Sequence, residues 1–270
     1  MRDDVIFIIY LYQKWIYPVD HTRVNEFGQG GDEAGAGAGA VSKMADAGGS
    51  ESDLFSVVRA ELLAAGVKPS PTAGQEQHFL CSRDKLKLLS SAVSRLCSEG
   101  EGEGECPPGP ARVVMELGAG AGSVARCLSP SSSLRLVLVE LDCNLCSLLR
   151  SLLDAGAFAG WQDVEVIEGD ALSALSSTRP EVEDGAVVVV SSLPSSMTQA
   201  VLKQLTSRPW LRGAVMAVAA EDAENQCKDE NGSHPSLSFA TICTLSQQDF
   251  EPPQKGLDAA LVLVTPRSAR

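Results

Sequence analysis

Short apolar runs alternate with stretches of helical periodicity through the second half of the chain. Five short runs that contain β-branched residues are expected to form strands: Val113–Leu117, Leu134–Glu140, Val164–Glu168, Ala186–Ser191 and Ala214–Ala219. Such alternation is typical of crossover helices on a parallel sheet. Two later runs, 238–245 and 259–264, flank a turn at Pro252 and Pro253. The pattern therefore predicts an α/β, Rossmann-like fold, with a mostly parallel seven-stranded sheet and an antiparallel C-terminal hairpin.

Two amphipathic helices are expected before the sheet. Apolar residues recur at helical spacing over 54–63, with Gly66 beyond the end, and again from Arg83 to Cys97. Residues 28–52 are rich in Gly, Ala and Ser and cannot bury enough apolar surface to fold. We therefore expect three parts: an N-terminal extension (1–52) that is disordered, or artefactual if translation begins at Met44; helices and a loop (53–110); and the sheet-containing core (111–270).

The chain is acidic, with a formal net charge of −13. A surface of this sign repels phosphate backbones, so we expect no tight, sequence-independent binding of nucleic acid by this chain alone. No apolar run approaches the roughly 18 residues that span a bilayer, and no signal or Arg-rich presequence is recognised. These features predict no membrane partner and an intracellular protein, in the cytoplasm or nucleus rather than the mitochondrion. We expect a monomer.

Eight cysteines are spread irregularly along the chain, unlike those of a small secreted disulfide scaffold. Their spacing favours a reducing compartment. Cys143 and Cys146 form an isolated Cys-x-x-Cys pair with no histidine nearby, which we interpret as two thiols on a buried helix rather than a zinc or redox site. No metal is expected.

A glycine-rich turn follows the first predicted strand of the core. It reads Glu116-Leu-Gly118-Ala-Gly120-Ala-Gly122, and the absence of side chains lets the backbone turn sharply and approach a ligand. A dinucleotide fingerprint would place its third glycine where Ser123 stands. The Gly-x-Gly-x-Gly spacing with a preceding Glu favours binding of S-adenosylmethionine, although such turns also occur without ligands.

Two acids end the next two predicted strands. Glu140 lies about 20 residues beyond the first glycine, where a carboxylate can accept both hydroxyls of a ribose. Asp170 follows the third strand and is placed to accept from an adenine amino group. Each acid alone is more often a solvated charge, but three consecutive strand ends with suitable groups predict a cofactor site.

The flanking motifs narrow the family. They are Gln77-His-Phe-Leu80, Val139-Glu-Leu-Asp142, Gly169-Asp-Ala171, Ser192-Leu-Pro-Ser195 and Phe250-Glu-Pro-Pro-Gln-Lys255 followed by Asp258. In order and spacing they resemble the ribosomal RNA adenine dimethyltransferases, which are class I S-adenosylmethionine-dependent methyltransferases, from about Gly74 to Pro266. The resemblance implies methyl transfer to adenine N6 of ribosomal RNA, with the small ribosomal subunit as partner.

The same resemblance assigns roles to single residues. It implies that His78 and Leu80 lie against the cofactor, that Gly118 supports its methionine part, and that Glu140 and Asp170 bind its ribose and adenine. Glu116, Gly120, Gly122 and Ser192 complete the predicted cofactor set, and Ser192, Pro194, Ser195 and Phe250 form the predicted catalytic, acceptor-facing set.

Departures from the family pattern are concentrated at the acceptor side. The family has Asn-Leu-Pro-Tyr where this chain has Ser192-Leu-Pro-Ser195. An adenine amine needs oxygen acceptors for its protons and an aromatic face to hold the flipped base. Ser192 is shorter than Asn, and Ser195 cannot stack. Phe250 matches a family aromatic and could compensate, or it could be a core residue beneath the hairpin.

Two further departures weaken the case for an autonomous RNA enzyme. The chain ends at Arg270, so we expect it to lack the C-terminal helical domain of the family, and an irregular acidic loop is expected over 221–235. Two alternatives therefore stay open. One is a methyltransferase with a small-molecule, lipid or protein acceptor; the other is a catalytically degenerate paralogue that acts as an accessory factor in ribosome assembly or transcription.

Overall fold

The computed structural model describes residues 52–69, 77–98, 111–177, 183–228, 234–253, 256 and 258–267. All of them belong to one compact unit that spans Met44–Arg270. Residues 1–51, which make up nearly all of the expected N-terminal extension, lie outside the described residues. The loop expected over 99–110 lies outside them as well.

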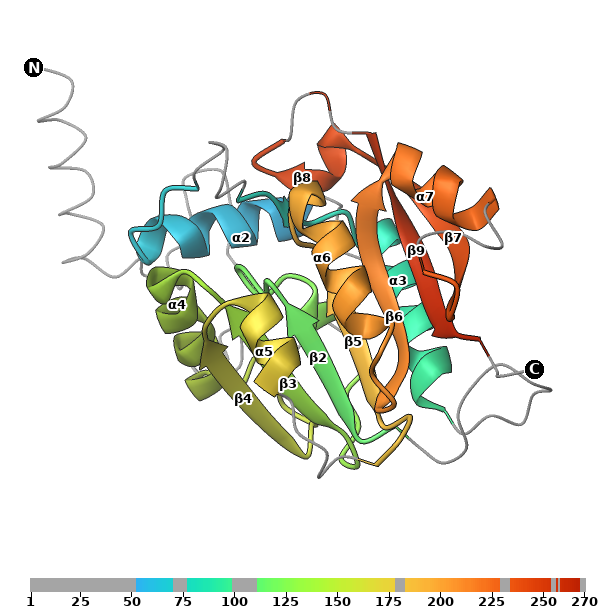
Figure 1. The fold of residues 1–270 in the computed structure, drawn as a ribbon. Coiled ribbons are helices and arrows are strands. Elements are labelled where there is room, and N and C mark those ends of the chain that lie inside the picture. Colours follow the sequence, from blue (N-terminus) through green and yellow to red (C-terminus); the bar gives the residue numbers. More distant parts are fainter. Residues whose placement is uncertain are drawn as a thin grey trace, which may run out of the picture. The chain divides into compact units, whose positions relative to one another are not determined.

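Seven strands form a single mixed sheet in the order β4-β3-β2-β5-β6-β9-β7 (Figure 1). They are β2 (Val113–Leu117), β3 (Arg135–Glu140), β4 (Asp163–Glu168), β5 (Val187–Ser191), β6 (Leu211–Ala219), β7 (Leu237–Ser246) and β9 (Asp258–Pro266). The first five strands in this order, β4, β3, β2, β5 and β6, pair in parallel, whereas β9 pairs antiparallel with both β6 and β7. The predicted parallel sheet with an antiparallel C-terminal hairpin is confirmed.

Helices cover both faces of this sheet, because its central strands are apolar on both sides. All five residues of β2 and all five of β5 are buried. On one face, alternate strand residues such as Val114 and Leu136 pack under α2 (Ser52–Ala64), α3 (Arg83–Cys97) and α4 (Cys143–Asp154). On the other, Met115 and Val137 pack under α5 (Ala171–Ser177), α6 (Ser195–Leu205) and α7 (Ala220–Lys228). Strands that are apolar on both faces therefore form a parallel sheet that is buried between two layers of helices.

Helix α2 begins and ends close to its predicted limits and packs against the sheet. Leu54, Val58 and Leu62 recur at helical spacing and are at most 3% exposed. Two bidentate ion pairs tether its polar side: Arg59 to Glu251, with nitrogen–oxygen distances of 2.9 and 2.7 Å, and Arg126 to Glu61, at 2.8 and 2.9 Å. The apolar stripe and the ion pairs together fix this helix against the core.

A two-stranded ribbon that the sequence pattern did not predict lies beside the main sheet. Strand β1 (Phe79–Leu80) pairs antiparallel with β8 (Phe250–Glu251), and the amides of Cys81 and Ser82 continue the pairing by donating to the Asp249 carbonyl at 2.8 and 3.2 Å. The ribbon brings the segment around His78, which lies between α2 and α3, to the hairpin near the C-terminus.

A fully buried cation caps the C-terminal end of α3. Arg212, on β6, is 0% exposed and donates to the main-chain carbonyls of Leu96, Ser98 and Gly185. The last carbonyls of a helix have no partner within the helix, and a positive charge at that end is favoured by the helix dipole. Arg212 therefore binds α3 to the central strands.

Two expectations need correction. The predicted irregular acidic loop over 221–235 is helical in its first part, because α7 runs from Ala220 to Lys228 with Glu221 and Asp222 in a first turn where acids favour helix formation. Cys146 is buried on α4 as predicted, but Cys143 is exposed. Within the described ranges there is no group of three potential metal ligands, and no helix has the length and apolarity that a bilayer crossing requires.

Candidate cofactor pocket and acceptor site

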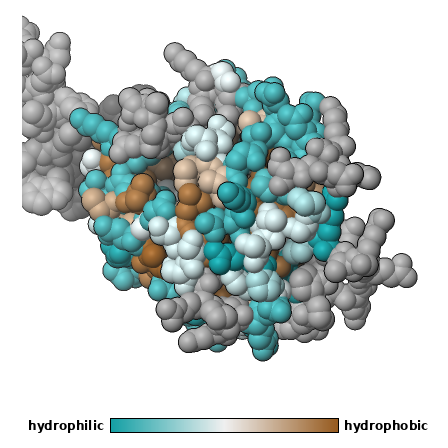
Figure 2. Space-filling model, in the orientation of Figure 1, coloured by the Kyte–Doolittle hydropathy of each residue, from teal (hydrophilic) through white to brown (hydrophobic). Residues whose placement is uncertain are grey.

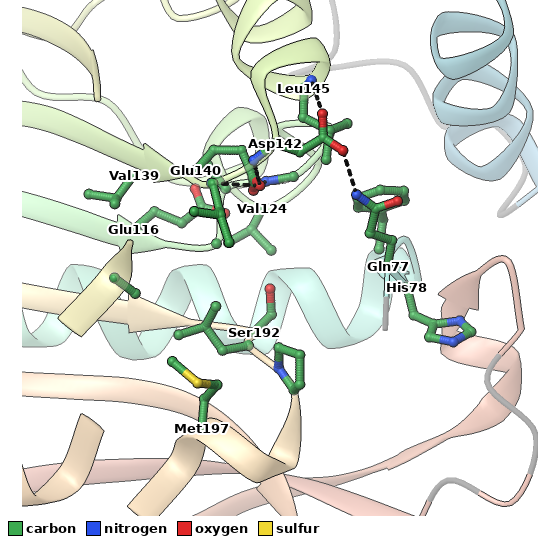
Figure 3. A pocket seen from close by; sticks show the side chains of 18 of the residues that line it. Gln77, His78, Glu116, Val124, Val139, Glu140, Asp142, Leu145, Ser192 and Met197 are labelled. Atoms are coloured by element: carbon green, nitrogen blue, oxygen red, sulfur yellow. Dashed lines mark hydrogen bonds between the residues drawn. The ribbon is translucent and has the colours of Figure 1, made fainter. Parts of the chain in front are cut away.

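A cavity of about 490 Å³ opens where the parallel strands β2, β3 and β5 end (Figure 3). Crevices at this edge of a doubly wound sheet are the usual ligand sites, because the turns that follow the strands converge there. Its lining contains most of the predicted cofactor set: His78, Leu80, Glu116, Gly118, Gly120, Glu140, Asp170 and Ser192. Strand ends that are far apart in sequence thus meet at one cavity.

The glycine-rich turn forms one wall, and two other residues of the lining pack closely against it. Gly118 and Gly120 have φ angles of +71° and +54°, which other residues rarely adopt. A Cβ at Gly118 would lie 2.6 Å from the Leu193 side chain, and one at Gly120 would lie 2.6 Å from the ring of Phe79. The two glycines are therefore required both by backbone conformation and by the approach of their neighbours.

Gly122 differs from the other two glycines. It also has a positive φ, of +71°, but it does not line the cavity. A Cβ there would meet the Leu149 side chain at 3.0 Å and the Phe158 ring at 3.4 Å. The structure thus places the third glycine at the packing contact between the turn and α4, behind the cavity wall.

Glu140, at the end of β3, organises the turn with its carboxylate. Its Oε2 accepts from the Gly120 amide at 2.8 Å, and its Oε1 accepts from the amides of Leu141 and Asp142 at 2.8 and 2.9 Å. The residue is 8% exposed. Three charge-assisted bonds to backbone amides hold the glycine turn and the end of β3 in one geometry.

Glu116, at the end of β2, has the opposite environment. It is 1% exposed, and its two carboxyl oxygens are buried without a hydrogen-bond partner in the part of the chain that the structure describes. Burial is the main cause that raises the pKa of Glu116 well above its usual range, and the nearby charge of Glu140 raises it further. The nearby backbone amide of Ala125 lowers this pKa, but by less than burial and Glu140 raise it.

Two other acids at the cavity act as helix caps. Asp170 accepts from the Ser173 amide at 2.8 Å at the start of α5, and Asp142 accepts from the amides of Asn144 and Leu145 at the start of α4. Gln77 donates to the second oxygen of Asp142 at 2.9 Å, which links the segment before β1 to α4. These hydrogen bonds lower the pKa of Asp142 despite the opposing effect of its partial burial.

Sequence reasoning had not assigned a role to Asp142, Gln77 or Leu141. The lining includes all three, and Leu141 is 69% exposed although it is large and apolar. Its position between Glu140 and Asp142 offers a flat ligand an apolar contact. The sequence contained a signal for Leu141, since a leucine between two acids directly after a strand is not expected to be buried in the core.

On the face drawn in Figure 2, apolar side chains show only as small patches between hydrophilic ones.

A smaller hollow of about 40 Å³ adjoins the cavity at His78, Ser192 and Pro194. All four predicted acceptor-facing residues line it, and Ser192 and Pro194 line the larger cavity too. Ser195 is exposed at the start of α6, while Phe250 is only 5% exposed. His78 also lines both spaces, and its Nδ1 lies 2.7 Å from the Pro252 carbonyl oxygen, so this nitrogen carries the proton. The hollow is narrow and its walls are mostly small residues.

The donors and acceptors of the larger cavity suit a nucleoside with a charged tail. Its size is within the range of small-ligand sites. Glycine amides, carboxylates at three strand ends and apolar surfaces such as Leu141 are all present in its lining. Figure 3 shows Glu116 and Glu140 beside one another, with Ser192 and Met197 across the cavity from them.

Solved structures share this fold. The 23S rRNA methyltransferase ErmE matches with a TM-score of 0.52 and 20% identity over 70% of each chain. A dimethyladenosine transferase from Plasmodium falciparum matches with a TM-score of 0.51 and 22% identity, over 70% of this chain and 63% of that one. The chain has the Rossmann-like fold of class I methyltransferases.

A distant relative matches over most of the chain. Ribosomal RNA small subunit methyltransferase A from Pelagibacter ubique is 25% identical over 214 residues, which cover 74% of this chain and 71% of that protein. The resemblance to ribosomal RNA dimethyltransferases is thereby confirmed, as a distant one. No family model matches the chain.

A short segment matches a different kind of protein. The lipid scramblase CLPTM1L from Pongo abelii is 62% identical over 37 residues, and its Homo sapiens counterpart is 66% identical over 32 residues. These stretches cover 14% and 12% of this chain, and only 7% and 6% of the scramblases. The chain therefore spans less than a tenth of the scramblases' length.

Proposed function

We propose that this chain binds S-adenosylmethionine in the large cavity and acts as a methyltransferase. The observation that carries the proposal is the convergence of the glycine turn and the Glu116, Glu140 and Asp170 strand ends on one cavity of suitable size. In this arrangement Glu140 accepts from the ribose, Asp170 from the adenine, and Leu141 packs against the base. When bound, the cofactor supplies an electrophilic methyl group.

We further propose adenine N6 of ribosomal RNA as the methyl acceptor. The distant similarity to a small-subunit ribosomal RNA methyltransferase supports this choice. Pro194 can offer its carbonyl and Ser192 its hydroxyl to the amine protons at the junction of the two spaces. The residues of this chain would act by holding the nitrogen in line with the methyl group, because proximity and alignment can lower a reaction barrier by roughly 7–11 kcal/mol.

One observation favours a second candidate, a methyltransferase with a slimmer acceptor. The hollow beside the cavity measures only about 40 Å³. Ser195 stands where an aromatic would stack, and Phe250 is buried. Stacking on a base contributes roughly 1–3 kcal/mol. An amine or hydroxyl on a narrow chain, from a small molecule, lipid or protein, would enter such a hollow without that contribution.

The test begins with isothermal titration of the purified protein with S-adenosylmethionine and S-adenosylhomocysteine. Binding in the micromolar range is expected, and no binding by a folded protein would refute the proposed function. Labelled cofactor is then offered with small-subunit ribosomal RNA, and separately with mixtures of amines, lipids and proteins. Label in RNA supports the first acceptor, and label only in the other mixtures supports the second. Binding without transfer to any of them would favour a non-enzymatic accessory factor.

A further inference from the structure

Among the described residues, His78 is the only one that presents a titratable side chain to both spaces of the site. It lines the large cavity and the adjoining hollow. The other titratable residues of the cavity wall do not line the hollow; they are Glu116, Glu140, Asp142, Cys143 and Asp170. The remaining side chains around the hollow are apolar, apart from the hydroxyls of Ser192 and Ser195. Of these lining residues, His78 is therefore the one base at the place where the two spaces meet.

The hydrogen bond between His78 and the chain fixes which ring nitrogen can accept a proton. Nδ1 lies 2.7 Å from the carbonyl oxygen of Pro252, which can only accept, so Nδ1 carries the ring proton. Nε2 then holds a lone pair; it has no hydrogen-bond partner among the described residues and is not fully buried. An imidazole held by its Nδ1–H in this way presents its basic nitrogen in a fixed orientation. The same carbonyl stabilises the imidazolium that forms when Nε2 takes up a proton.

Methyl transfer to a neutral amine or hydroxyl requires a base, because the acceptor must lose a proton. A carbonyl or hydroxyl oxygen, such as those of Pro194 and Ser192, can accept a hydrogen bond from this proton but is too weak a base to remove it. Resting on the proposed function, we propose that His78 is the general base for the acceptor. The acceptor nitrogen or oxygen forms a bond to the methyl carbon, the carbon–sulfur bond breaks with its electron pair on sulfur, and the acceptor's proton moves to Nε2. His78 then returns the proton to solvent.

The charged groups near the imidazole have partners of their own. On β8, Glu251 is bound by both nitrogens of the Arg59 fork. On the other side, Asp142 accepts from Gln77 and from backbone amides of α4. Four further acids lie on the cavity wall or beside the ribbon: Glu116, Glu140, Asp170 and Asp249. None of these described carboxylates pairs with the imidazole, so the lone pair on Nε2 is available to the acceptor.

The experiment compares His78→Gln with a matched variant of another histidine. Labelled methyl groups are offered to whichever acceptor the unaltered protein labels, small-subunit ribosomal RNA first. A glutamine can still donate to the Pro252 carbonyl but cannot take up a proton. We expect kcat to fall about 100-fold, while the affinity for S-adenosylhomocysteine in calorimetry changes by less than about threefold. His234→Gln is the control and should keep the unaltered rate, because His234 is buried against Thr206 and Gln199 and lines neither space.

Three further readouts are specific to a base. The kcat of the unaltered protein should fall with acidity below about pH 7, where imidazole groups become protonated, and His78→Gln should lack this decline. In His78→Ala, added imidazole should restore turnover. The third readout needs no turnover: ¹⁵N NMR of the three histidines above about pH 8 should show His78, assigned from its loss in His78→Gln, protonated at Nδ1 and not at Nε2.

The outcomes separate two failures. If S-adenosylhomocysteine does not bind, or if the unaltered protein labels no acceptor, the proposed function and the role of His78 are both wrong. If the unaltered protein transfers methyl groups and His78→Gln does so at the same rate, the function stands and the role of His78 is wrong. A proton on Nε2 rather than Nδ1 in the NMR spectrum would also refute the role. Loss of cofactor binding in His78→Gln, with no rescue of His78→Ala by imidazole, would show that His78 is only structural.

Discussion

Replacing Glu140 with Gln tests whether one carboxylate holds the cofactor turn together. An amide offers one acceptor oxygen, so if it serves the amides of Leu141 and Asp142, its NH₂ group faces the buried Gly120 amide. A buried donor without a partner costs about 1–3 kcal/mol, and the two remaining bonds lose their charge assistance. We expect Glu140→Gln to lower the free energy of unfolding by about 2–3 kcal/mol.

This loss is measurable by urea unfolding. With a slope of about 1–3 kcal/mol per molar for a small protein, the midpoint should fall by on the order of 1 M. Cofactor affinity, measured by titration calorimetry, should fall roughly 10- to 100-fold, since a similar free energy is lost from the ribose contact.

Glu168→Gln is the matched control. Glu168 stands opposite Glu140 in the β3–β4 register, but its side chain is 49% exposed and its partner is Arg150 at 3.6 Å. Exposed pairs contribute little, so this variant should change stability by less than about 1 kcal/mol. If Glu140→Gln unfolds at the same urea concentration as Glu168→Gln, the carboxylate does not organise the turn and the reasoning is refuted.

Four further predictions use the same two measurements or a methylation assay. Gly120→Ala should lose more stability than Gly156→Ala. Both variants carry the left-handed backbone strain of about 1–2 kcal/mol, but only the Cβ at position 120 also meets the Phe79 ring, so equal losses would contradict the prediction. Arg212→Met should cost about 2–4 kcal/mol in urea unfolding by leaving buried carbonyls without donors, and an unchanged midpoint would exclude a capping role. The double change Ser192→Asn and Ser195→Tyr should raise methylation of adenine in ribosomal RNA at least severalfold, whereas no gain would indicate a different acceptor. The pKa of Glu116 is raised in the folded state, so its protonated form favours folding. The stability of the cofactor-free protein should therefore fall as pH rises above the ordinary carboxyl range. Glu116→Gln should reduce this dependence of stability on pH, and an unchanged dependence would show that other groups cause it.

The sheet was predictable because its central strands are short apolar runs with sharp polar limits. Val113–Leu117 is the same range in the prediction and in β2, and the next strand differs by one residue at its start. A parallel sheet buried on both faces needs uninterrupted apolar residues, which the sequence shows directly. The strand-end acids were predictable for the same reason, since parallel strands end at one edge.

The remaining features depend on contacts between distant segments. Strands of two residues, such as Phe79–Leu80, are too short to show a period, and their partner is at the other end of the domain. Helix α7 has no apolar stripe, because Ala223 is its buried residue, so its polar sequence resembled a loop. Which glycine faces the cavity is set by packing: Gly122 is directed against Leu149, and no local pattern encodes that neighbour.

The order of synthesis determines when the cavity can be completed. The contact between His78 and Pro252 joins residues 174 apart, and strand β9 inserts between β6 and β7, both of which emerge from the ribosome before it. At about 5–20 residues per second, roughly 10–35 s pass between the two halves of that contact. During this interval the segment around Phe79 lacks its partner β8, and β6, once made, lacks its partner β9 until Asp258–Pro266 follows; exposed strand edges of this kind promote aggregation. The nascent domain therefore fixes the His78 side of its cavity only after Phe250–Pro252 has been made, although the rest of the lining, which ends at Met197, is already present by then.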